Sequence, residues 1–192
     1  MTMLILGLLL FLGVHSLRIF AEGWRTGLRQ RMGENAFKGL YSVLSIVGFA
    51  LIVWGYGVAR QQPLALWASP VWTRHLAALL TLPAFVLLVA AYVPGNAIKA
   101  RLHHPMVIAV KVWAAAHLLA NNTLADLLLF GSFLVWAALS FRAARQRDRV
   151  AHTVYLPGRA MPTVTTVVVG LAAWIGFALW AHTAWIGVRP FG

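Results

Sequence analysis

Long runs of hydrophobic residues dominate this chain, and short polar segments separate them. Each run is close to the ~20 residues that an α-helix needs to cross the hydrocarbon core of a bilayer. The runs cover residues 1–20, 40–59, 72–93, 105–120, 124–141 and 163–186. Turn-forming residues mark two of the gaps, Pro94-Gly95-Asn96 and Asn121-Asn122. The pattern predicts an all-α, polytopic membrane protein built as a bundle of about six transmembrane helices.

The segments between the runs are too short to form a second folded unit. Six spans of ~20 residues use most of the chain, so the sequence predicts a single integral membrane domain over residues 1–192. The first run begins at once with hydrophobic residues, and its first basic residue is Arg18. A secretory signal peptide has the opposite order, with basic residues first and a small-residue cleavage site at its end. We therefore expect an uncleaved anchor with its N-terminus outside the cytoplasm.

Basic residues are concentrated in alternate polar segments. The chain has 16 Lys and Arg against 4 Asp and Glu, a formal net charge of +12. Eleven of the 16 lie in segments 21–39, 94–104 and 142–162, which follow the first, third and fifth runs. Cytoplasmic loops of membrane proteins carry the excess of Lys and Arg. The three segments are therefore predicted to face the cytoplasm, with both termini outside, and we expect no nucleic-acid partner for this positive charge.

The composition excludes several function classes. Hydrophobic residues make up 61% of the chain and charged residues 10%, against ~45–50% and ~25% in an average soluble domain. A water-soluble monomer and a disordered chain are both excluded, and the lipid bilayer is the expected partner. The chain has no cysteine, which removes disulfides, thiolate nucleophiles and Cys-ligated cofactors. Only four acidic residues are present, so a hydrolase with paired carboxylates is not expected.

Ionisable residues inside the predicted spans are the candidate functional residues, because such groups are costly in lipid. His15, Arg18 and Glu22 have the spacing of one helix face, and we expect them to satisfy one another inside the bundle. His104 opens the fourth span, and Lys111 follows two turns later on the same face. Arg18 is close enough to the membrane surface to snorkel. Lys111 is deeper, so we expect it to have a buried partner.

The depths of the histidines limit which of them can share a ligand. His104 and His117 are thirteen residues apart, ~20 Å along a helix, and cannot bind one metal ion together. His15 and His104 are both predicted near the cytoplasmic side, which makes them the candidate metal-binding pair. His117 is predicted near the outer side, where His75 or His182 could pair with it. Interfacial or capping roles remain equally open for His15 and His104.

Three stretches of the chain resemble the NnrU family. They are LGVHSLRIFAEGWR (Leu12–Arg25), KGLYSVLSIVGFALIVWGYG (Lys38–Gly57) and HPMVIAVKVWAAAHLLANNTLADLLLFGSFLVWA (His104–Ala137). The resemblance extends over about residues 3–150, and the last span fits it more loosely.

The resemblance implies a multi-pass protein of the bacterial inner membrane that supports denitrification. It would act on the expression or activity of nitrite and nitric oxide reductases, whose components are then expected partners. The family is also similar to 15-cis-zeta-carotene isomerase, a membrane enzyme whose haem b iron is held by a His and a Cys. With no cysteine in this chain, a haem b would need two histidines, or one histidine and a weaker ligand.

Three functional hypotheses follow from the residues and the resemblance together. The first is a haem- or metal-dependent membrane factor for nitrogen-oxide respiration. The second is a non-catalytic assembly or regulatory protein, and the third is a haem-dependent isomerase of a hydrophobic polyene. In the haem hypotheses the cofactor-binding residues are His15, His104, His117, Arg18 and Lys111, with His15 and His104 as ligands of the iron or metal.

Overall fold

All the regular elements are helices in the part of the chain that the structure, a computed structural model, describes, residues 1–191. Five helical segments there are long and apolar enough to cross a membrane. They are α1 (Thr2–Phe20), α3 (Glu34–Ala59), α4 (Trp72–Tyr92), α7 (Leu124–Val150) and the continuous segment Ala160–Ile186. The last consists of α8 (Ala160–Gly176), one π-helical turn η1 (Phe177–Ala181) and α9 (His182–Ile186). The predicted all-α fold is confirmed, with five helical segments that could span a membrane.

Three shorter helices complete the fold: α2 (Glu22–Met32), α5 (Ala97–Leu102) and α6 (Pro105–Ala120). The hydrophobic pattern of the sequence does not predict α2 or α5. Helix α6 has exactly the bounds of the fourth predicted span, but its 16 residues extend only ~24 Å at 1.5 Å per residue. It is apolar and lies between α4 and α7. It is therefore several Å shorter than the ~30 Å core of a bilayer, whereas α1, the shortest of the other five, has 19 residues and extends ~28.5 Å.

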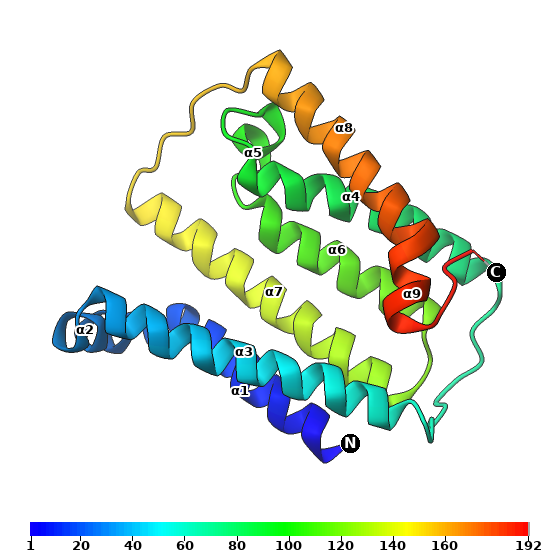
Figure 1. The fold of residues 1–192 in the computed structure, drawn as a ribbon. Helices are drawn as coiled ribbons and strands as arrows, with labels where there is room; N and C mark the ends of the chain where they lie inside the picture. Colours follow the sequence, from blue (N-terminus) through cyan, green and yellow to red (C-terminus); the bar gives the residue numbers. More distant parts are fainter. Residues whose placement is uncertain (192) are drawn as a thin grey trace.

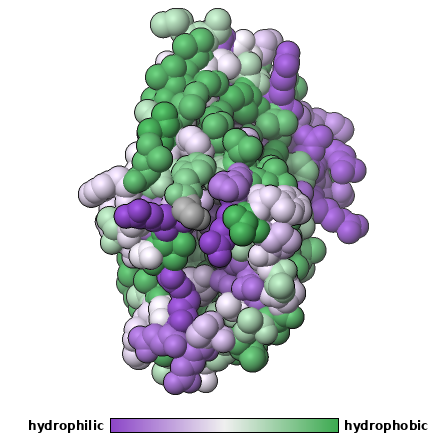
Figure 2. Space-filling model, turned by 90° about the vertical axis from the view of Figure 1, so that its right-hand side faces the viewer, coloured by the Kyte–Doolittle hydropathy of each residue, from purple (hydrophilic) through white to green (hydrophobic). Residues whose placement is uncertain are grey.

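The five long segments and α6 form a row in which each packs against the next, in the order α3, α1, α7, α6, α4, α8. Figure 1 shows α7, α6, α4 and α8 side by side, with α3 in front of α1. Successive helices along the chain run in opposite directions, so both chain ends lie at the same end of the molecule (Figure 1). We call the other end the basic end; it consists of residues 21–39, 94–104 and 142–159. Figure 2 shows the end that carries the termini, where hydrophilic residues gather across the middle and along one side.

Two helices extend further toward the basic end than the hydrophobic runs indicate. Helix α3 begins at Glu34 rather than residue 40, and the Glu34 carboxylate pairs with Lys38 (2.7 Å) and Arg29 (3.1 Å). Helix α7 continues past residue 141 to Val150. These extra turns carry charged side chains that can lie in the headgroup layer, so hydropathy gives the end of the apolar segment but not the end of the helix.

Helices α1 and α3 pack closely because glycines lie where they meet. A Cβ atom added at Gly55 would lie 2.2 Å from the main-chain nitrogen of Leu4, and one at Gly48 would lie 2.8 Å from that of Phe11. Gly7 on α1 has a similar contact with α3. In lipid, where hydrophobic burial does not drive helices together, such small residues let backbones approach and gain van der Waals contact.

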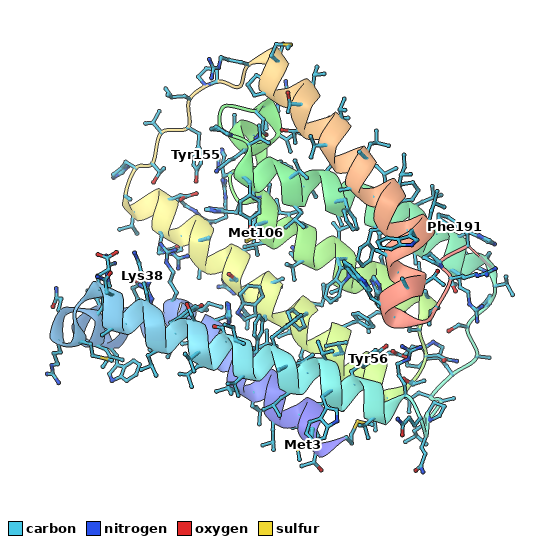
Figure 3. All side chains as sticks on the ribbon, viewed as in Figure 1. Met3, Lys38, Tyr56, Met106, Tyr155 and Phe191 are labelled. Carbon is cyan, nitrogen blue, oxygen red and sulfur yellow. The ribbon has the colours of Figure 1, made fainter. Side chains whose placement is uncertain are left out.

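A buried carboxylate joins α3 to the start of α7. Asp126 is 5% exposed, and its carboxylate accepts from the Thr123 main-chain nitrogen at 3.0 Å while its own main-chain nitrogen donates to the Thr123 hydroxyl oxygen at 3.2 Å, which is a capping box. The Thr123 hydroxyl also donates to the same carboxylate at 2.6 Å. The Tyr56 hydroxyl of α3 donates to the other Asp126 oxygen at 2.5 Å. Figure 3 labels Tyr56 on α3. The sequence analysis did not single out this network.

Candidate ligand-binding cleft at the basic end

A cleft of about 640 Å³ opens between α1, α3, α6 and α7 at the basic end. We call it the interfacial cleft. Its volume lies within the ~300–1,000 Å³ typical of small-molecule sites. Its polar lining residues are His15, Arg18, Arg25, Tyr41, His104, Ser140, Arg147, Asp148 and Thr153. Two of the predicted candidate histidines and one predicted arginine thus meet in one cavity.

His15 is held in a fixed orientation by its neighbours. Its Nδ1 donates to the main-chain oxygen of Phe11 at 2.7 Å, and its ring stacks on the Phe11 ring with centroids 4.2 Å apart. Tyr41 of α3 and Trp136 of α7 lie against the same ring, at centroid distances of 5.3 and 6.1 Å. Its Nε2 makes no hydrogen bond within residues 1–191, so this nitrogen is available to a ligand.

His104 is oriented by a carboxylate from the far end of α7. It precedes Pro105, the first residue of α6, and its Nε2 donates to the Asp148 Oδ2 atom at 2.8 Å. The Tyr155 hydroxyl donates to the same oxygen at 3.0 Å, and Figure 3 shows Tyr155 on the loop after α7. Burial and this hydrogen bond raise the pKa of the Tyr155 phenol. Asp148, the one carboxylate that lines the cleft, therefore already has two donors.

The arginines give the interfacial cleft an excess of positive charge. The guanidinium of Arg147 donates to the main-chain oxygen of Arg18 at 3.1 Å, which places two basic residues from α1 and α7 together. Arg25 of α2 pairs with Glu22 at 3.2 Å. Helix α1 ends at Phe20, so Glu22 begins a new helix, and the prediction that it shares a helix face with Arg18 is wrong.

A second layer of contacts holds the loop after α7 against the start of α6. The ring of His103 stacks on that of Tyr155, with centroids 3.9 Å apart and planes 2° from parallel, and Arg145 hydrogen-bonds to His103. His103 has a φ of 68°, uncommon for a residue with a side chain. These contacts fix the conformation of the chain directly before His104.

Two of the predicted site residues do not line the interfacial cleft. The Lys111 Nζ atom lies 5.2 Å from the centre of the Phe141 ring, a cation–π contact, and no ion pair to Lys111 forms in the described chain. Its expected buried partner is thus an aromatic face. His117 donates to the main-chain oxygen of Trp113 at 2.8 Å and stacks on Phe130 at 4.6 Å.

The donor set does not fit a haem held by both His15 and His104. An axial histidine uses Nε2, the ring nitrogen remote from its own main chain, because the macrocycle would otherwise collide with that main chain. His104 gives its Nε2 to Asp148, which leaves Nε2 of His15 alone. Nor does any group of three or more His, Cys, Asp or Glu side chains within residues 1–191 have the geometry to hold a metal ion. His15 and His104 are therefore not arranged as the two ligands of one haem iron or metal ion.

Several residues of the cleft were not predicted from the sequence. Arg25, Arg147 and Asp148 lie outside the predicted spans. They are therefore not among the ionisable residues that the sequence places inside the membrane. Tyr41 is an ordinary aromatic residue of its span. The signal that could have found Arg147 and Asp148 is continuation of the helix past the hydrophobic run, since both then lie about two turns beyond Ser140.

The family relationship follows from a match along nearly the whole chain. The sequence model of the family described as NnrU protein matches residues 3–190. The chain belongs to the NnrU family. The match extends past residue 150, where the resemblance seen in the sequence became looser, and includes the helical segment Ala160–Ile186. No curated protein and no solved structure matches the chain. The interfacial cleft is therefore interpreted from its own geometry as a feature of this NnrU-family protein.

Proposed function

We propose that this NnrU-family protein supports nitrogen-oxide respiration from a bacterial cytoplasmic membrane, by promoting the expression or activity of nitrite and nitric oxide reductases. Membership of the NnrU family supports the proposed role in nitrogen-oxide respiration. The observation that carries the molecular part is the interfacial cleft, in which three arginines and two histidines surround one carboxylate that is already hydrogen-bonded. The protein acts, in this proposal, by binding an anionic ligand there.

The proposal includes an orientation. The basic end faces the cytoplasm, because Lys and Arg accumulate on that side of membrane proteins. With α6 counted as a crossing the chain crosses six times, and an even number of crossings places both termini on the same side, here outside. The short length of α6 is compatible with this, since local thinning of the bilayer accommodates a short span at modest cost. The interfacial cleft then opens at the cytoplasmic headgroup layer, within reach of reductase components or their regulators.

The lining of the cleft suits binding and positioning of an anion. Arg18, Arg25 and Arg147 supply charged N–H donors, and charge-assisted hydrogen bonds are about twice as strong as neutral ones. The Nε2 atom of His15, whose Nδ1 already donates to Phe11, accepts a hydrogen bond in the neutral ring and donates one to the anion when the ring is protonated. The position of the cleft at the edge of the hydrocarbon layer lowers the local dielectric constant and strengthens each of these contacts. His104, oriented by Asp148, is placed to exchange a proton with a ligand.

We expect Arg147→Ala to lower nitrite and nitric oxide consumption several-fold in a denitrifying strain that lacks its own copy and is complemented with this chain. The matched control is Arg149→Ala, which removes an exposed arginine two residues away on the same helix and should complement fully. Membrane levels of both variants are measured alongside gas and nitrite consumption. If the single variants Arg147→Ala, His15→Ala and His104→Ala all complemented fully, the result would contradict a role for the cleft. It would favour a purely structural assembly protein.

A further inference from the structure

A second cavity lies next to the interfacial cleft, on the surface between α1 and α7. It has a volume of about 450 Å³ and is shallower and more open. We call it the apolar groove; its lining includes Leu12 and Ser16 of α1 and Gly131, Val135 and Leu139 of α7. Val135 and Leu139 are 60% and 38% exposed, so the groove faces the surrounding lipid rather than the protein interior.

The groove continues the cleft toward the middle of the bilayer. Along α1, Ser16 of the groove follows His15 of the cleft, and along α7, Leu139 of the groove precedes Ser140 of the cleft. From Leu139 to Gly131 the groove then extends ~12 Å along α7, at 1.5 Å per residue. Along α7 most groove residues lie further from the basic end than Ser140, Arg147 and Asp148 of the cleft, whereas along α1 the two sets lie at the same level. The two cavities are therefore adjacent, one cationic and toward the basic end, the other mainly apolar.

Trp136 lies where the two cavities meet, because it lines both of them. Its indole Nε1 is buried and has no hydrogen-bond partner within residues 1–191. A buried tryptophan N–H normally has an acceptor, and leaving it without one costs free energy. Trp136 is therefore an unpartnered hydrogen-bond donor between a region that suits an anion and a region that suits a hydrocarbon chain.

We propose that the interfacial cleft and the apolar groove together bind one anionic phospholipid of the adjacent leaflet. Its phosphate pairs with Arg18, Arg25 and Arg147, an ester carbonyl accepts from Trp136 Nε1, and one acyl chain lies along the groove. A phospholipid carries these three groups in this order. The inference rests on the proposed function, since it names the ligand of the same cleft. It also predicts selection by charge, because the cationic cleft holds no free carboxylate to bind a choline or ethanolamine group.

The test measures lipid binding to the purified full-length protein in detergent by native mass spectrometry. The probes are phosphatidylglycerol and phosphatidylcholine with identical chains. We expect phosphatidylglycerol to bind at one molecule per chain and at least ten-fold more tightly. Arg147→Ala should remove this preference, whereas the control Arg149→Ala should retain it. Trp136→Phe, which keeps an aromatic side chain and removes the indole N–H, should weaken the binding of phosphatidylglycerol several-fold.

The groove is tested separately by filling it. Gly131→Leu adds a side chain at a position where the nearest neighbour of an added Cβ, Leu127 Cδ1, is 3.8 Å away, so the fold should tolerate it. It should weaken phosphatidylglycerol binding several-fold without affecting the binding of glycerol 3-phosphate, which has no chain. The matched control is Gly13→Leu on α1, where an added Cβ meets nothing within 4 Å.

Three results would overturn the phospholipid proposal. One is equal binding of the two lipids, and another is glycerol 3-phosphate binding as tightly as phosphatidylglycerol, which would assign the cleft to a small soluble anion. The third is a Soret absorption band in the purified protein that His15→Ala removes, which would assign the cleft to haem. None of these three results tests the role in respiration, which the complementation experiment tests separately. Failure of the phospholipid proposal and failure of the proposed function are therefore distinguishable.

Discussion

Gly55→Ala is expected to prevent accumulation of the folded protein, although it adds a single methyl group. The added carbon would lie 2.2 Å from the Leu4 main-chain nitrogen and 2.7 Å from the Leu4 Cα and the Met3 carbonyl carbon. All three atoms belong to the backbone of α1, so no side-chain rotation relieves the overlap, and α1 must move away from α3. Overpacking of side chains costs ~1–3 kcal/mol. We expect at least about 3 kcal/mol here, a large part of a typical folding free energy of ~5–15 kcal/mol.

The same helix provides a control that separates this contact from a general effect of replacing glycine. An added Cβ at Gly57 meets nothing within 4 Å, and alanine has the higher helix propensity by ~0.8–1.0 kcal/mol. Gly57→Ala should therefore match or exceed the parent protein in stability. Both variants are compared by thermal melting in detergent with size-exclusion detection of the monodisperse fraction. Equal melting temperatures for Gly55→Ala and Gly57→Ala would show that α1 and α3 are not packed as closely as described.

The hydrophobic pattern was sufficient to locate the membrane helices, because burial in lipid depends on each residue's own chemistry. It was not sufficient for the ends of α3 and α7. Glu34 and Arg147 are polar, yet they continue their helices into the headgroup layer, where charge and helical structure are compatible. A rule that ends a span at the first cluster of charges ends it too early.

For the site, depth along each helix could be predicted and lateral neighbours could not. Counting residues from the helix ends placed His15 and His104 on the same side, and both line the interfacial cleft. Their partners depend on which helices lie side by side and how each is rotated. Asp148 reaches His104, and Trp136 lies against His15, only because α7 packs between α1 and α6. A single sequence without these packing angles gives no direct signal for either contact.

Asp126→Ala should be the most destabilising substitution of a polar residue outside the cleft. It removes the carboxylate that accepts from the Thr123 main-chain nitrogen and from the hydroxyls of Thr123 and Tyr56, whereas the Thr123 hydroxyl can still accept from the main-chain nitrogen of residue 126. Hydrogen bonds to a charged group contribute ~1.5–3 kcal/mol each. We expect a combined loss of about 3 kcal/mol. Asp126→Asn should lose less, because its amide oxygen can still accept from the main-chain nitrogen of Thr123.

A double-mutant cycle tests whether the stabilisation passes through the contact between α3 and α7. Tyr56→Phe alone should cost about 1–2 kcal/mol, since it removes one hydrogen bond to a carboxylate, and should cost almost nothing once Asp126 is alanine. Tyr92→Phe removes a hydroxyl from a side chain that is 71% exposed and serves as the control. If Tyr56→Phe were equally costly in both backgrounds, the Tyr56 hydroxyl would act through a group other than Asp126, because phenylalanine keeps the ring and its packing. The carboxylate would then stabilise the start of α7 without linking it to α3.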